Sequence, residues 1–256
     1  MLRLRHTMVE FSVEERLRSA ETVCRGLLVP FRALPLQARV HRAFASEPVP
    51  GIVCAAKGPL PPGYVQLGVS FPFREDGSRV RAAFALPPER IGKAHSPYDV
   101  LRRLQTNSFE GAAALMGLRA LCETHGVEVG LFGSAALQIL TGLPYMESGS
   151  DVDAVVRPSS FARLRQIHAG LAALRADYQR KFDVEATLPD GVGVKLNELM
   201  SSTTTVVGRG IDGVRLLDWA AVVRDLDQFE GSSVSGESIT TEENEDGSQI
   251  KNAEQG

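Results

Sequence analysis

Residues whose side chains could do chemistry gather in one stretch near the middle of the chain. Gly133-Ser134 follow a short apolar run, and Asp151 and Asp153 flank Val152 at the start of a second one. Alternate residues of a strand point to the same face, so a strand beginning at Asp151 carries both carboxylates on one face, with Cα atoms roughly 6.6 Å apart. Two carboxylates that close repel each other, and a hard divalent cation offsets the repulsion. The pair predicts a site for Mg²⁺, with Mn²⁺ as an alternative.

The Gly133-Ser134 pair predicts a turn that binds phosphate. A glycine lets a phosphate approach the backbone closely, because it has no side chain in the way. The amide groups that open the following helix favour an anion, and the Ser134 hydroxyl can donate to a phosphate oxygen. Together with a metal on the acidic strand, such a turn would hold phosphates during a phosphoryl-type transfer.

A third carboxylate is expected on a neighbouring strand, predicted over residues 181–187. Asp183 and Glu185 alternate there and share a face. Asp183 is the candidate general base or a further metal ligand, whereas Glu185 is either solvated or functional. Each motif alone is a weak signal, but a Gly-Ser turn followed by two acidic strands favours a catalytic site over an ordinary turn.

Four basic residues are candidates for binding a phosphate-bearing substrate. Arg79 and Arg81 alternate on a predicted strand, which indicates either a solvated strand face or a contact to phosphate or a partner protein. Lys195 and Arg209, farther along the chain, are the candidates for reaching a triphosphate. The five histidines have no metal-ligand spacing.

Apolar periodicity and turn residues predict the elements that position these side chains. Residues 12–28 are predicted as a helix, with Ser12 and Glu15 in a capping-box pattern. Its apolar stripe consists of Val13, Leu17, Ala20 and Cys24. The remaining elements are a β-rich region over 36–88, a helix over 108–125, strands over 127–132 and 151–156, a helix to about residue 178, and hairpins over 181–196 and 206–217.

This pattern predicts an α+β fold: a nucleotidyltransferase-like mixed sheet with flanking helices, plus a smaller β-rich N-terminal domain. The predicted divisions are a helical extension (1–29), the β-rich domain (30–106), a catalytic domain (107–228) and a disordered acidic tail (229–256). The tail contains seven acidic residues and one lysine, a net charge of −6. Because the whole chain carries −3, the rest carries +3, which is too little to indicate a nucleic-acid-binding surface.

Cysteine usage and hydropathy indicate a cytoplasmic protein. Cys24, Cys54 and Cys122 are odd in number and widely spaced, which argues against a disulfide framework and a zinc site. No apolar stretch approaches the length of a membrane span or of a signal peptide, so we expect no membrane contact.

In these segments the chain resembles the nucleotidyltransferase superfamily. Within it the chain is similar to the malonate decarboxylase holo-[acyl-carrier-protein] synthases, also called phosphoribosyl-dephospho-CoA transferases. The resemblance spans residues 30–220 and depends on three motifs: Phe132-Gly-Ser-Ala-Ala136, Leu140-Thr-Gly-Leu-Pro-Tyr145 and Ser150-Asp-Val-Asp153. It departs from the family pattern at four positions: Ser70, Leu137, Val184 and Arg209.

The resemblance implies transfer of a phosphoribosyl-dephospho-CoA group from 2′-(5″-triphosphoribosyl)-3′-dephospho-CoA to a serine of the malonate decarboxylase acyl-carrier protein, with release of pyrophosphate. Asp151 and Asp153 would hold Mg²⁺, Gly133 and Ser134 would bind the departing phosphates, and Asp183 would accept the serine proton. Two alternatives stay open. One is an NTP-dependent nucleotidyltransferase acting on another protein or small molecule, and the other is a non-catalytic module that binds a carrier protein.

Overall fold

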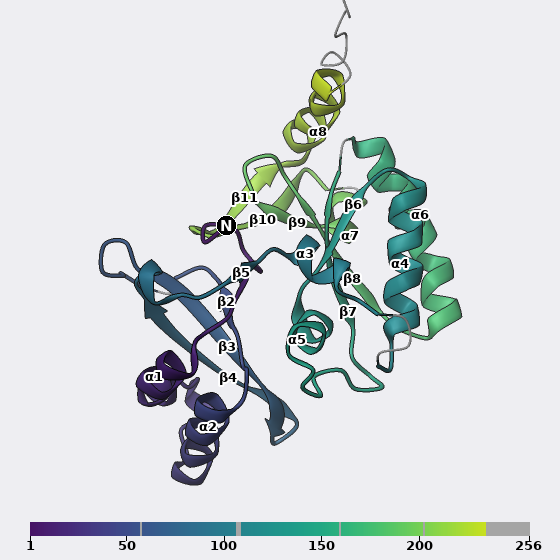
Figure 1. The fold of residues 1–256 in the computed structure, drawn as a ribbon. Helices are drawn as coiled ribbons and strands as arrows, with labels where there is room; N and C mark the ends of the chain where they lie inside the picture. Colours follow the sequence, from purple (N-terminus) through teal and green to yellow (C-terminus); the bar gives the residue numbers. More distant parts are fainter. Residues whose placement is uncertain (57, 106–108, 159, 202, 234–256) are drawn as a thin grey trace, which may run out of the picture.

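The computed structural model describes residues 1–56, 58–105, 109–158, 160–201 and 203–233, with the backbone alone for residues 229–233. Two β-sheets, each with its own helices, make up the fold (Figure 1). The second sheet mixes parallel and antiparallel pairs, so the predicted α+β class is confirmed. The closer likeness to a nucleotidyltransferase sheet stays a prediction.

The first sheet is antiparallel and has the strand order β4-β3-β2-β1-β5. Its strands are β1 (Met8–Val9), β2 (Gly51–Val53), β3 (Val65–Glu75), β4 (Ser78–Leu86) and β5 (Ala94–His95). The β3–β4 hairpin turns at Asp76 and Gly77, whose φ angles are 48° and 74°. Both residues adopt the left-handed conformation of a tight hairpin turn.

Helices α1 (Val13–Arg25) and α2 (Leu34–Ser46) pack on each other and against this sheet (Figure 1). Helix α2 falls inside the segment predicted to be β-rich, so that prediction missed a helix. Pro35 lies in the first turn of α2, where its missing N–H is not needed. Two short 3₁₀ helices complete this part: η1 (Val29–Phe31) and η2 (Pro88–Arg90).

Helix α1 forms where it was predicted, but its buried face differs from the predicted stripe. Val13 and Leu17 are each 60% exposed, whereas Ala20, Val23 and Cys24 are buried against the sheet. The stripe was therefore wrong in its first half and right in its second.

The second sheet has the strand order β11-β10-β9-β8-β7-β6. Its strands are β6 (Glu128–Leu131), β7 (Val152–Arg157), β8 (Phe182–Thr187), β9 (Gly193–Lys195), β10 (Thr205–Gly210) and β11 (Gly213–Asp218). Strands β7 and β8 pair in parallel, and the other described neighbours are antiparallel. The parallel pair is joined by a helical crossover, as such pairs require.

Helices α4 (Ala112–Thr124) and α6 (Phe161–Tyr178) pack together and cover one face of the second sheet (Figure 1). Val152, Ala154 and Val156 of β7 are wholly buried in the core on that side. Because side chains alternate along a strand, Asp153 and Val155 lie on the opposite face. The other helices of this part are α3 (Pro97–Arg102), α5 (Gly133–Thr141), α7 (Leu196–Leu199) and α8 (Trp219–Ser233).

The opposite face of the second sheet receives helix α3 and residues 1–7, which we call the N-terminal arm. A Cβ on Gly130 of β6 would lie 2.7 Å from the backbone of Tyr98, which shows how closely α3 approaches. The arm leads into β1, which pairs with β2 and β5 in the first sheet. One short segment at the start of the chain therefore contacts both sheets.

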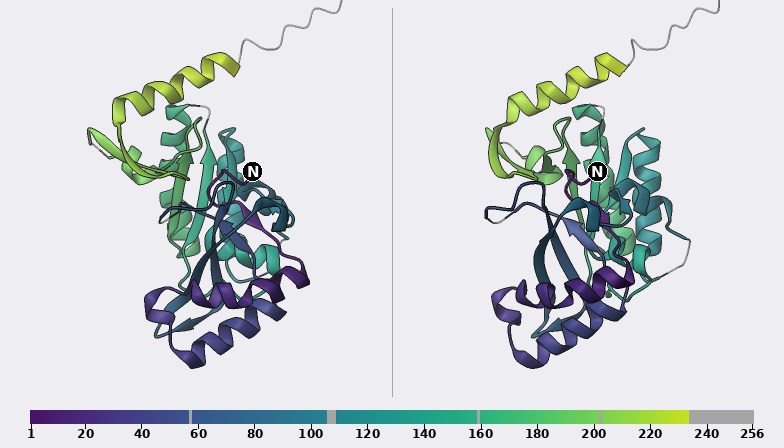
Figure 2. Two further views of the ribbon diagram at one scale, coloured as in Figure 1. Left: turned by 90° about the vertical axis from the view of Figure 1, so that its left-hand side faces the viewer. Right: turned by 60° about the vertical axis from the view of Figure 1, so that its left-hand side comes forward.

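Helix α8 lies across one end of the part that holds the second sheet, and its residues Val222 and Leu226 are buried in that core (Figure 2). It runs to Ser233, so it includes the first residues of the segment predicted as a disordered tail, and residues 234–256 lie outside the described part. No helix among the described residues is long and apolar enough to cross a membrane. The structure joins no two of the three cysteines by a disulfide.

Candidate active site

Asp153 and Asp183 lie next to each other on the second sheet. The parallel pairing of β7 with β8 sets them directly opposite each other, on the face that α4 and α6 do not cover. Asp151 lies one residue before β7 begins, and its side chain is 42% exposed. Val152, which lies between Asp151 and Asp153 in the sequence, is fully buried, so the predicted alternation along the strand is present.

Asp151, Asp153 and Asp183, which we call the acidic group, lie close enough that the charges of two of them affect the pKa of the third, Asp153. Burial, followed by the negative charges of Asp183 and Asp151, raises this pKa to about 7. Lys195 and Lys181 act in the opposite direction without cancelling the effect. The Asp153 carboxyl group therefore titrates near neutral pH. The three aspartates together carry more negative charge than the two lysines neutralise.

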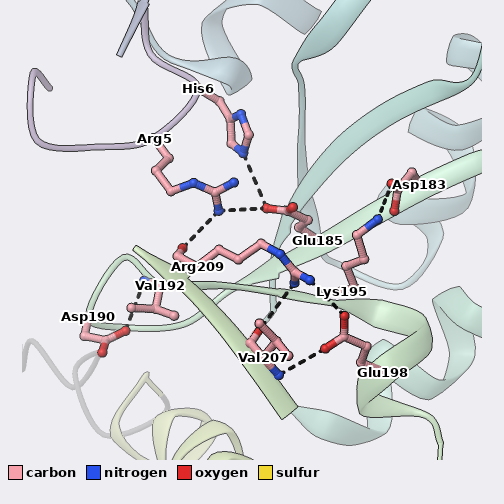
Figure 3. Close-up of polar contacts among 10 residues, drawn as sticks. All are labelled: Arg5, His6, Asp183, Glu185, Asp190, Val192, Lys195, Glu198, Val207 and Arg209. Carbon is pink, nitrogen blue, oxygen red and sulfur yellow. Dashed lines mark hydrogen bonds and ion pairs between the residues drawn. The ribbon is translucent and has the colours of Figure 1, made fainter. Parts of the chain in front are cut away.

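Each of the other two carboxylates has a lysine partner. Lys181 Nζ lies 2.9 Å from Asp151 Oδ2, and Lys195 Nζ lies 2.5 Å from Asp183 Oδ2 (Figure 3 shows the second pair). Among the described residues, no cation lies within ion-pair distance of Asp153. The central carboxylate is thus the one that an added cation would neutralise.

Gly133 adjoins Asp153 so closely that a side chain there would have to displace the carboxylate. A Cβ on Gly133 would lie 2.0 Å from Asp153 Oδ2, and the glycine has φ +65°, a conformation that side chains disfavour. The amide of Phe132, the residue before it, donates to the backbone oxygen of Asp153 over 3.1 Å. Gly133 and Ser134 open helix α5, and Ser134 is half-buried there. The turn and the acidic strand, which the sequence predicts to act together, lie in direct contact.

The donor set of this site fits a magnesium ion. All three carboxylates offer hard oxygen ligands. Burial first, and then the neighbouring negative charges, raise the pKa of Asp153, and a divalent cation would offset both effects. No group of three or more His, Cys, Asp or Glu side chains in the described part of the chain is already arranged around one metal position. Magnesium commonly takes only one or two protein carboxylates and completes its shell with water and substrate phosphates.

Comparison with known families places the chain. The model of the phosphoribosyl-dephospho-CoA transferase MdcG C-terminal domain matches residues 99–220, and that of the MdcG N-terminal domain matches residues 4–97. The chain belongs to the MdcG family. It is therefore a transferase that acts on phosphorus-containing groups. The N-terminal match includes residues 4–28, which the sequence alone set apart as an extension.

Curated relatives carry the same family name. A phosphoribosyl-dephospho-CoA transferase of Xanthomonas campestris pv. campestris is 29% identical over 186 residues, which cover 73% of this chain and 86% of the relative. One from Xanthomonas euvesicatoria pv. vesicatoria is 27% identical over the same shares. One from Bradyrhizobium diazoefficiens is 31% identical over 101 residues, 40% of this chain and 45% of the relative. No solved structure matches the chain.

Arg79 of this MdcG-family chain is not on a solvated strand face, so that interpretation is wrong. It is 8% exposed, and its Nη2 donates to the backbone oxygen of Tyr145 over 2.7 Å and to Glu147 over 3.3 Å. Arg74 also pairs with Glu147. Both arginines thus fasten the β3–β4 hairpin to the loop that leads to Asp151.

Of the three remaining basic candidates, one contacts the acidic group and two lie elsewhere. Lys195 contacts Asp183, so it belongs to the acidic group. Arg81 is exposed on β4. The guanidinium of Arg209 donates to Glu198 over 3.1 Å and to the Val207 oxygen, away from the aspartates (Figure 3). Direct contact with the acidic group is therefore confined to one of the four predicted basic residues.

Glu185 is neither solvated nor part of the acidic group. It is 5% exposed and accepts hydrogen bonds from Arg5 Nη1 over 3.1 Å and from His6 Nε2 over 3.4 Å (Figure 3). Burial raises its pKa, but the His6 hydrogen bond and the Arg5 charge outweigh that effect and leave the pKa at about 2. Glu185 is thus an ionised, buried anchor for the N-terminal arm.

Three residues of this region were missed by the sequence reasoning. Lys181 has a signal, because it alternates with Asp183 on the same strand and a cation beside paired acids is informative. Arg5 and His6 have none, since the segment that contains them is far away in the sequence and shows no periodicity. Only the fold brings the start of the chain to β8.

Proposed function

We propose that this protein transfers a phosphoribosyl-dephospho-CoA group from 2′-(5″-triphosphoribosyl)-3′-dephospho-CoA to a serine of the acyl-carrier protein of malonate decarboxylase, with release of pyrophosphate. The observation that carries the proposal is the contact between Gly133 and Asp153, which joins a phosphate-binding turn to a carboxylate pair in a chain of this family. A triphosphate donor needs both parts next to each other.

In this proposal Asp151 and Asp153 hold Mg²⁺, for which Mn²⁺ can substitute. When bound, the ion would neutralise charge on the triphosphate. Its positive charge would also return the pKa of Asp153 towards its ordinary range, because an adjacent cation favours the ionised carboxyl group. Hard oxygen donors and an excess of negative charge support this choice over a thiophilic metal.

The protein's own groups would move one proton and hold the leaving group. The carrier serine Oγ would bond to the α-phosphorus, the bond from that phosphorus to the pyrophosphate oxygen would break, and the serine proton would pass to Asp183. Lys195 holds the Asp183 carboxylate in place and would help to balance the phosphate charge. The departing pyrophosphate would lie against the first amides of α5 and the hydroxyl of Ser134.

Incubation of the apo carrier protein with either donor, followed by intact-mass spectrometry, tests the proposal. We expect a mass gain equal to phosphoribosyl-dephospho-CoA with the triphosphoribosyl donor and none with ATP. A gain with ATP alone would instead identify an NTP-dependent nucleotidyltransferase. Binding of the carrier without any mass gain would identify a non-catalytic module, and Asp153→Asn is the matched inactive control.

A further inference from the structure

The N-terminal arm reaches the second sheet at two points, of which Figure 3 shows the first, at Glu185 and Arg209. Arg5 Nη1 donates to Glu185 Oε2 over 3.1 Å and to the backbone oxygen of Arg209 over 2.9 Å. It therefore links β8, two residues beyond Asp183, to the end of β10. The side chain of Arg5 is only 19% exposed, so this contact is shielded from solvent.

His6 makes the second point of contact. Its ring stacks on the ring of Phe132, with centroids 3.9 Å apart and an angle of 26° between the planes. Phe132 directly precedes Gly133, and its amide donates to the backbone oxygen of Asp153. The ring of His6 thus rests on the residue that connects the phosphate-binding turn to the acidic strand.

The backbone of the arm is bent to reach both points. His6 has φ +63°, a left-handed conformation that few residues other than glycine adopt. Strain of this kind persists where the surroundings hold it, and it often marks a functional position. Its amide donates to the Val53 oxygen of β2 over 3.2 Å, so the strained residue is fixed to the first sheet as well.

Strand β9 also makes room for this arrangement. A Cβ on Gly193 would lie 2.7 Å from Glu185 Oε2 and 3.0 Å from Arg5 Nη1. A larger residue there would push the guanidinium and the carboxylate apart. Five elements thus accommodate the arm: β2, β8, β9, β10 and the turn before α5.

We propose that Arg5 and His6 are positioning residues of the active site, a role that rests on the proposed function. Arg5 holds β8 through Glu185 and so sets the place of Asp183. His6 holds the Gly133 turn through Phe132. The arm thereby fixes the distance between Asp183 and the amides of the Gly133 turn. Because the arm is also bonded to the first sheet, the position of that sheet affects the position of these residues.

Substitutions in the arm test the proposal. Arg5→Gln and His6→Ala should each lower kcat for carrier modification about tenfold, with a smaller change in KM, because they loosen the geometry of the transition state. His6→Phe should keep most of the activity, since a phenyl ring can still stack on Phe132. Gly193→Ala should reproduce the Arg5→Gln effect without any change in the arm itself. Arg3→Gln, which removes an exposed charge from the same segment, is the matched control.

A second readout separates positioning from general destabilisation. Hydrogen exchange of the free protein at residues 132–134 and 183–185 should speed up in Arg5→Gln and His6→Ala, while exchange in α4 and α6 stays as in the wild type. Unchanged kcat in both variants, or an equal loss in Arg3→Gln, would overturn the proposal. If the wild type modifies no carrier, the proposed function fails. The exchange experiment still tests the arm in that case, because unchanged exchange at residues 132–134 in Arg5→Gln and His6→Ala would overturn its positioning role.

Discussion

Asp153 and Asp183 lie directly opposite each other on the parallel pair β7 and β8, on the face of the sheet that α4 and α6 leave uncovered. Burial, together with the negative charges of Asp183 and Asp151, raises the pKa of Asp153 to about 7. A carboxyl group with such a pKa weakens the fold when it ionises. The protein therefore holds a destabilising charge at the position where the proposed metal would bind.

Asp153→Asn should stabilise the protein and abolish its activity. A folded-state pKa of about 7, above the unfolded value of 3.8, means that stability falls as the pH rises from about 4 to 7. At pH 8 the variant should be more stable than the wild type by roughly 1–4 kcal/mol without metal, and carrier modification should fall by about a thousandfold. Urea unfolding at pH 5 and pH 8 checks the first effect. A variant less stable than the wild type at pH 8 would contradict it.

Magnesium should raise the melting temperature of the protein by binding to the Asp153 carboxylate. Millimolar Mg²⁺ at pH 8 should stabilise the wild type, because a ligand that binds only the folded state adds to its stability. The shift should vanish in Asp153→Asn and persist in Asp190→Asn, which alters an exposed aspartate paired with Arg215. Calorimetric scans with and without EDTA measure it. An equal shift in Asp153→Asn would show that the metal binds elsewhere.

Much of the geometry of the candidate site could be predicted from the sequence, because local rules decide it. Alternation along a strand places Asp153 on one face and Val152 in the core, and a glycine before a helix indicates a turn that binds anions. The structure brings Gly133 into contact with Asp153, as the two motifs together suggested. Period-two patterning and turn chemistry are short-range signals, which explains why they were informative here.

The N-terminal part was harder to predict because long-range contacts override its local pattern. Glu15 fits a capping box with Ser12 and does donate its amide to the Ser12 hydroxyl, but its carboxylate pairs with Arg90, 75 residues away. Val13 and Leu17 match a helical stripe and are nevertheless exposed. Likewise Arg5 and His6 acquire a role only when β1 joins the first sheet, which their sequence does not indicate.

Arg79 should matter for stability rather than for substrate binding. Arg79→Gln removes the donor to the buried Tyr145 oxygen and should lower the free energy of unfolding by about 2 kcal/mol. Arg81→Gln, two residues along the same strand and exposed, should change it by less than about 0.5 kcal/mol. Urea denaturation compares the two. A raised KM for the donor in Arg79→Gln, with stability unchanged, would return Arg79 to the substrate-binding residues.

Glu185 should govern stability in acid. Its pKa of about 2 lies below the model-peptide value of 4.5, so its contribution is complete above pH 4.5 and is lost as the pH falls towards 2. The wild type should lose about 2 kcal/mol more than Glu185→Gln across this interval. Thermal unfolding between pH 2 and pH 6 measures the difference. Parallel curves for the two proteins would mean that Arg5 and His6 do not hold the carboxylate.

Gly133→Ala and Gly142→Ala should separate backbone strain from the site's geometry. Both glycines have positive φ, +65° and +73°, so alanine at either position should cost about 1–2 kcal/mol of stability. A Cβ at Gly142 would meet no atom within 4 Å, whereas one at Gly133 would lie 2.0 Å from Asp153 Oδ2. Only Gly133→Ala should therefore displace the carboxylate and lower kcat, by about a hundredfold. Unfolding and carrier-modification assays on both variants decide the matter. Equal activity in the two would mean that the contact between Gly133 and Asp153 has no part in catalysis.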